Sequence, residues 1–168
     1  MTTETTVDVI DKVLGLGPSS PLLALREQRA KLKHLTQTSY VAALHPADPR
    51  NFSYAERATL AARMAALWTS QELLAHYRDL ATAEGASGDV LSIADPAWKP
   101  EDEASRLAVI LRHVDLVTKN PKAATRENIE KLYAAGLDDR DIVTLAGIIA
   151  FVNYQVLVVA GLKMLRDN

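Results

Sequence analysis

The sequence contains no cysteine among its 168 residues. That absence excludes disulfide bonds, zinc sites with thiolate ligands and every mechanism that depends on a thiol. Glycine-rich phosphate loops, the nucleophile elbow and the dinucleotide-binding fingerprint are missing as well. An excess of basic charge is also missing, since the net charge is −2 and the Lys and Arg residues do not cluster with aromatic residues. We therefore expect no nucleic-acid partner.

The N-terminal stretch from Met1 to Asp11 lacks the basic start and the apolar run of a signal peptide. We therefore expect a cytoplasmic protein. The length fits one domain. We predict a single all-helical domain over residues 1–168, with an N-terminal extension at 1–20 and a core at 21–168.

Strand-like alternation of apolar and polar residues is absent, whereas helical spacing recurs along the chain, so the predicted fold class is all-α. The first expected helical element contains Val7, Ile10, Val13 and Leu14, and Gly15 and Gly17 stop it. The other expected helices span residues 21–44 (with 36–39 as a candidate break), 54–68, 71–83, 100–119, 125–135 and 138–166.

Capping patterns mark several helix ends. Ser53 and Glu56 form a capping box before the Ala-rich helix. Pro100 followed by three acidic residues is expected to open another helix, because acids complement the dipole of its first turn. Gly136 is expected to follow the end of one helix, and Asp138 to cap the last one.

The last helix carries apolar residues from Ile142 to Leu162 on every face, which predicts burial on all sides. A run of this length also matches a membrane span. Against that alternative, Asn153 and Gln155 would lie near the bilayer centre, and the end charges are mixed in sign. We favour the core helix of a soluble protein and expect no membrane partner.

The clearest candidate chemistry is the pair Glu72 and His76, which are four residues apart on one helix face. A carboxylate beside an imidazole orients the ring and raises its basicity, so the pair suits proton transfer near neutral pH. The alternative is an ordinary surface pair. His34, His45 and His113 give weaker signals, and nothing supplies the spacing of a third metal ligand. We predict no metal and no cofactor.

Two stretches together resemble the carboxymuconolactone decarboxylase and alkylhydroperoxidase-D-like family. The first holds Ser53-x-x-Glu56, then Leu-Ala-Ala-Arg, and ends in His76-Tyr77. The second runs from Ala-Ala-Gly136-Leu-Asp-Asp into a long helix with Asn153-Tyr154. This resemblance covers roughly the last two-thirds of the chain. It implies an alkylhydroperoxidase-D-like helical bundle with a long buried C-terminal helix, and assembly into a homo-oligomer.

The chain departs from the peroxidase branch at its redox centre. Setting His76 on the family's histidine places the two cysteine positions at Thr69 and Glu72, and neither is a thiol. Peroxide reduction through a thiolate and a disulfide is therefore excluded. The decarboxylase branch has a similar Glu-Leu-x-x-His, which Glu72 to His76 matches.

Two functions stay open at this point. One is acid–base chemistry on a small organic acid, with His76 and Glu72 as catalytic residues and Thr69, Asn153 and Tyr154 as substrate contacts. The other is a non-catalytic oligomeric binding or structural relative of the peroxidase branch. A concave pocket that holds His76 would favour the enzyme, and a solvated His76 would favour the binding or structural role.

Overall fold

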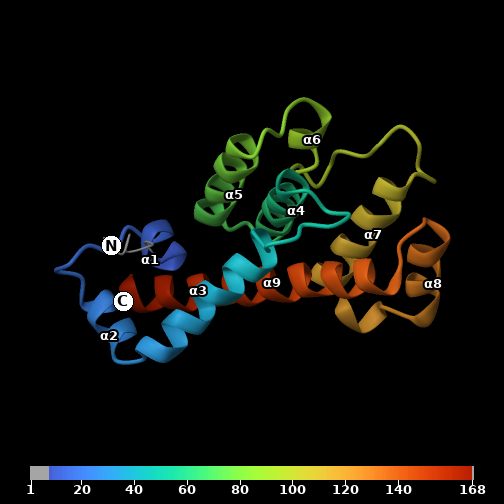
Figure 1. The fold of residues 1–168 in the computed structure, drawn as a ribbon. Coiled ribbons are helices and arrows are strands. Elements are labelled where there is room, and N and C mark those ends of the chain that lie inside the picture. Colours follow the sequence, from blue (N-terminus) through green and yellow to red (C-terminus); the bar gives the residue numbers. More distant parts are fainter. Residues whose placement is uncertain (1–7, 168) are drawn as a thin grey trace.

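The computed structural model describes residues 8–167, and this range contains helices and no strand. The all-α prediction is confirmed (Figure 1). The helices are α1 (Val9–Val13), α2 (Pro21–Glu27), α3 (Ala30–Leu44), α4 (Tyr54–Leu67), α5 (Gln71–Ala83), α6 (Asp89–Ser92), α7 (Arg106–Lys119), the 3-10 turn η1 (Pro121–Ala123), α8 (Arg126–Ala134) and α9 (Asp139–Arg166).

Helix α9 runs along the whole molecule, and most other helices are arranged around it (Figure 1). Its 28 residues make it about 42 Å long at 1.5 Å per residue. Helices α3, α4 and α7 pack against it, and α4 forms a close pair with α5. Helices α1 and α2 lie near the C-terminal end of α9, and α8 lies near its start.

The helix caps follow from short-range sequence signals. Ser53 accepts from the Glu56 N–H and the Glu56 carboxylate accepts from the Ser53 N–H, so the predicted capping box is confirmed. Asp138 caps α9 in the same way through Asp141. Gly136 has a φ of +87°, which a residue with a side chain rarely adopts, and it ends α8 as predicted.

The structure corrects the sequence analysis at two helix boundaries. The helix predicted over 21–44 breaks at Gln28 and Arg29, where the backbone of Arg29 leaves the helical region with a φ of −121°, and not at 36–39, which lie inside α3. Helix α7 starts at Arg106 and not at Pro100. Asp102 instead makes a turn, and Ser105 supplies the cap.

Helix α4 carries two buried arginines that hold loops in place. Arg63 donates to Asp115 at 2.6 and 2.7 Å and to main-chain carbonyls between Ile93 and Trp98. Within residues 8–167, Arg57 donates only to carbonyls, those of Ala43, Pro49 and Phe52. The loops before α4 and after α6 are therefore fixed to the core by α4.

Only one side of α9 is buried in the single chain. The prediction that α9 is buried on all sides is therefore wrong for the isolated chain. Leu145, Val152 and Val159 lie in the core, whereas Val143 is 71% and Leu157 58% exposed. By length and composition α9 is apolar enough to cross a membrane, with a mean hydropathy of 2.2 over its most apolar window, and 44% of that window is buried. An exposed apolar face of this kind is typical of an interaction surface.

The N-terminal extension contributes to the core, because Ile10 and Leu14 are buried there. Residues 1–7 lie outside the described range, as does the part of the N-terminal expectation that falls on them.

Candidate functional site

His76 lies on α5 and faces Tyr40 of α3. The imidazole Nε2 and the Tyr40 hydroxyl are 3.0 Å apart, and the two ring centroids are 5.8 Å apart. Tyr40 is buried and its ring also packs edge-on against Phe151 of α9. The histidine is therefore held by a side chain from another helix.

Burial sets the protonation states of this pair. The pKa of His76 is lowered to about 4, mainly by burial; the charge of Lys12 contributes to this shift and that of Asp79 opposes it. Burial, assisted by Glu84, raises the pKa of Tyr40 to about 12. At neutral pH the site thus contains a neutral imidazole and a protonated phenol.

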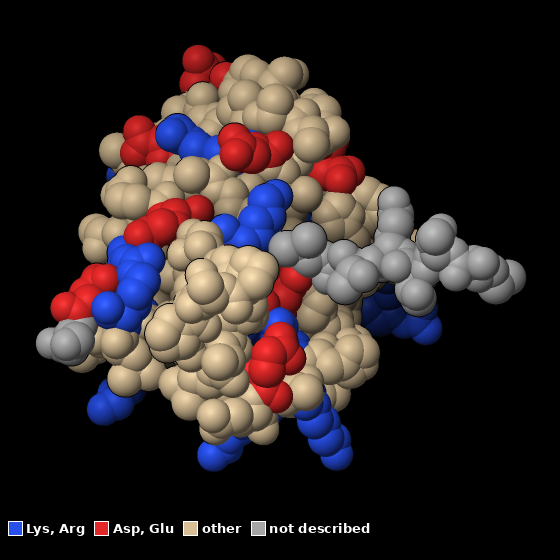
Figure 2. Space-filling view, turned by 90° about the vertical axis from the view of Figure 1, so that its left-hand side faces the viewer, with Lys and Arg blue, Asp and Glu red and all other residues tan. Residues whose placement is uncertain are grey.

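His76 borders an open hollow of about 320 Å³ between α1 and α5. Its lining residues are Lys12, Val13, Glu72, His76, Asp79, Leu80 and Ala83. Figure 2 shows the end of the molecule where α1, α2 and the end of α9 meet, and acidic and basic side chains alternate on that face. The volume suits a small molecule.

Glu72 makes no hydrogen bond with His76, so the predicted orienting bond is wrong. One Glu72 oxygen instead accepts from Lys163 of α9, because the C-terminal turn of α9 brings that ammonium group beside α5. This bond is the main reason that the pKa of Glu72 is lowered. The other oxygen, Oε2, is buried and has no hydrogen-bond partner. Glu72 and His76 share the hollow but not a bond.

The three predicted substrate contacts lie elsewhere. Thr69 lies in the α4–α5 turn with a φ of +56° and lines a different hollow, of about 570 Å³. The Asn153 amide oxygen accepts from the Trp68 indole at 2.6 Å and its NH2 donates to Ile149. The Tyr154 hydroxyl lies 2.9 Å from the Thr36 hydroxyl and lines a third cavity. None of the three lines the His76 hollow.

The sequence analysis missed Tyr40 and Lys12. Both are far from His76 in the chain, and no local spacing links them to it. The one sequence feature that could have pointed to Tyr40 is that it is an aromatic residue within a polar stretch of α3. Among residues 8–167 the structure brings no group of three His, Asp or Glu side chains into the arrangement of a metal site.

No protein-family model matches the sequence, and no curated protein matches it either. The structure is similar to a crystal structure of an uncharacterized peroxidase-related protein from Silicibacter sp. TM1040. The TM-score is 0.70 at 17% sequence identity, over 80% of this chain and 69% of the other. The chain therefore shares the helical fold of that protein.

Proposed function

We propose that this chain performs thiol-free proton transfer on a small organic acid in the His76 hollow. The observation that carries the proposal is the neutral, half-buried imidazole fixed by Tyr40 at the wall of a concave hollow. A perturbed titratable group in a concave hollow is the common signature of an acid–base site.

His76 acts as the proton-transferring residue. In the tautomer with hydrogen on Nε2, the ring donates to the Tyr40 oxygen and its Nδ1 lone pair is left to accept a proton. Tyr40 is a positioning residue because its high pKa keeps it protonated. Replacement of the tyrosine hydroxyl should therefore change the pH profile more than it changes substrate binding.

Lys12 explains why the substrate would be an acid. Its positive charge lies near His76 and disfavours the imidazolium. A bound carboxylate would neutralise that charge and raise the pKa of His76 towards neutrality, so binding itself prepares the histidine for proton transfer. Enolisation and decarboxylation of a small acid both need a proton acceptor or donor of this kind.

The proposal is tested by comparing the turnover of small acids by the wild type, a His76 variant and a control variant. Wild type, His76→Gln and the exposed His34→Gln are incubated with small 2-oxo, 3-oxo and unsaturated carboxylates in deuterated water. Proton NMR then follows deuterium incorporation into the substrate and the appearance of a decarboxylated product. We expect both to require His76 and to be unaffected at His34. Equal rates in wild type and His76→Gln would refute the proposal.

The second candidate is the oligomeric binding or structural role, which the exposed side of α9 favours. We propose that a second copy of the chain covers this apolar side, since isologous pairing of such faces is the usual way to bury them.

The proposed location is cytoplasmic, with no membrane partner.

Light scattering tests the assembly. We expect a mass that is a multiple of 18.3 kDa. Leu157→Glu should shift it towards the monomer, whereas Leu25→Glu, an exposed leucine on α2, should not. A monomeric wild type, or a protein that is recovered only in detergent, would contradict this proposal.

A further inference from the structure

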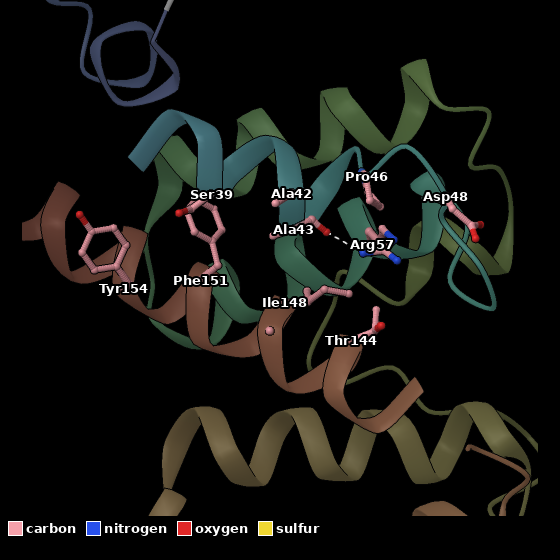
Figure 3. A pocket seen from close by; sticks show the side chains of 11 residues that line it. Ser39, Ala42, Ala43, Pro46, Asp48, Arg57, Thr144, Ile148, Phe151 and Tyr154 are labelled. Carbon is pink, nitrogen blue, oxygen red and sulfur yellow. Dashed lines mark hydrogen bonds between the residues drawn. The ribbon is translucent and has the colours of Figure 1, made fainter. Parts of the chain in front are cut away.

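A cavity of about 600 Å³ lies between α3 and α9, separate from the His76 hollow (Figure 3). It exists because the facing positions carry small side chains, Ala42 and Ala43 on α3 and Gly147 on α9. Ile148 and Phe151 supply apolar walls. The volume and the mostly apolar lining are those of typical small-molecule sites. It shares no lining residue with the His76 hollow.

Arg57 supplies a positive charge at one end of this cavity. Its side chain is buried, with 3% exposure, and it donates to three carbonyl oxygens at 2.8 to 2.9 Å. A guanidinium has five N–H bonds, so two remain without a partner among the described residues. No carboxylate of residues 8–167 lies within ion-pair distance of it.

Arg63 provides the comparison on the same helix. It is equally buried, with 2% exposure, but Asp115 neutralises its charge through two hydrogen bonds. Burial lowers the pKa of Arg57, and the more distant charges of Asp48 and Glu56 oppose that shift without forming an ion pair. An anion in the cavity would give Arg57 the partner that Arg63 already has.

Polar groups on the cavity wall complete the pattern. The hydroxyls of Ser39 and Thr144 line it and make no hydrogen bond with another described side chain, and the Tyr154 hydroxyl lies at the far end from Arg57 (Figure 3). Asp48 lies at the exposed rim near Arg57 and opposes an anion there.

We propose that the cavity between α3 and α9 binds a small organic carboxylate with an apolar body, whose carboxylate pairs with Arg57. The carbon chain lies against Ile148 and Phe151, and the hydroxyls of Ser39 and Thr144 bind the polar groups of the ligand. This site is independent of the proton-transfer site, since its lining lacks His76, Tyr40 and Lys12.

The experiment uses octanoate as the probe and isothermal titration calorimetry as the readout, with octanol as the neutral control. We expect octanoate to bind at least tenfold more tightly than octanol, because a charged pair with a desolvated guanidinium is stronger than a neutral contact. Equal binding of the two would overturn the proposal.

Arg57 itself is a poor test position, because replacing its side chain would leave three main-chain carbonyls without their hydrogen-bond donor. Gly147→Leu instead fills the cavity, and a Cβ at Gly147 meets no atom within 4 Å. Gly161 of the same helix is also exposed and open at Cβ but lies outside the cavity. We expect Gly147→Leu to weaken octanoate binding tenfold or more and Gly161→Leu to leave it unchanged.

Asp48→Asn tests the sign of the charge. Removal of a carboxylate at the rim should tighten octanoate binding about threefold and leave octanol unaffected. Unchanged octanoate binding in Gly147→Leu would overturn the proposal. A second result would also overturn it. If the wild type does not bind octanoate and Gly147→Leu abolishes self-association, the cavity belongs to an interface between copies of the chain.

Discussion

His76 makes the stability of this protein depend on pH in a window that the structure defines. The unfolded histidine has a pKa near 6.5, and burial lowers it to about 4 in the folded chain. Between these values the unfolded state binds a proton that the folded state does not. The free energy of unfolding therefore falls as the pH falls from about 6.5 to about 4.

The magnitude follows from the same two pKa values. At about 1.4 kcal/mol per pH unit the largest loss is about 3 kcal/mol. Because the ring is partly open to the hollow, solvent relieves part of this cost, and we expect a loss of about 1–2 kcal/mol.

The perturbation is His76→Gln, which cannot take up a proton in this range. Urea unfolding followed by circular dichroism at about pH 7 and about pH 4.5 gives the loss for each variant. His34→Gln is the control, since His34 is exposed. We expect His76→Gln to lose about 1–2 kcal/mol less on acidification than wild type and His34→Gln. An equal loss in all three proteins would refute the buried, neutral state of His76.

Three further predictions concern stability. Thr69→Asn should stabilise the chain by about 1 kcal/mol in urea unfolding, because asparagine tolerates the positive φ that strains a β-branched residue; a loss of stability would contradict that strain. Arg63→Met should cost about 3 kcal/mol, since it leaves Asp115 and several carbonyls unpaired, and an unchanged midpoint would refute that role. Asp141→Asn should cost about 2 kcal/mol by thermal melting, because the new amide faces the NH2 of Asn51; combination with Asn51→Asp should restore part of it.

Features that depend on neighbours in the chain were predictable. The boxes at Ser53 and Asp138 and the end of α8 at Gly136 are formed by residues within three or four positions of each other. The start of α7 was mispredicted because acids after Pro100 are also consistent with a turn, and the hydrogen bonds of Asp102 decide for the turn.

The candidate site depends on distant pairings that no local pattern encodes. His76 was predictable from the resemblance and its position on a helix, but its partner Tyr40 is 36 residues away. Glu72 was assigned to His76 by the four-residue spacing, yet Lys163, 91 residues later, binds it. The Glu72 carboxylate pairs with the Lys163 ammonium group because a hydrogen bond between charged groups is stronger than one to a neutral imidazole.

The most direct test of the central claim is an NMR titration of the His76 imidazole, observed in protein labelled with nitrogen-15, with and without a saturating small carboxylate. The proposal predicts a neutral ring near pH 6 in the free protein, with an apparent pKa of about 4, and an upward shift of that pKa when the carboxylate binds beside Lys12. A free-protein pKa near 6.5 that the carboxylate does not change would contradict the proton-transfer site.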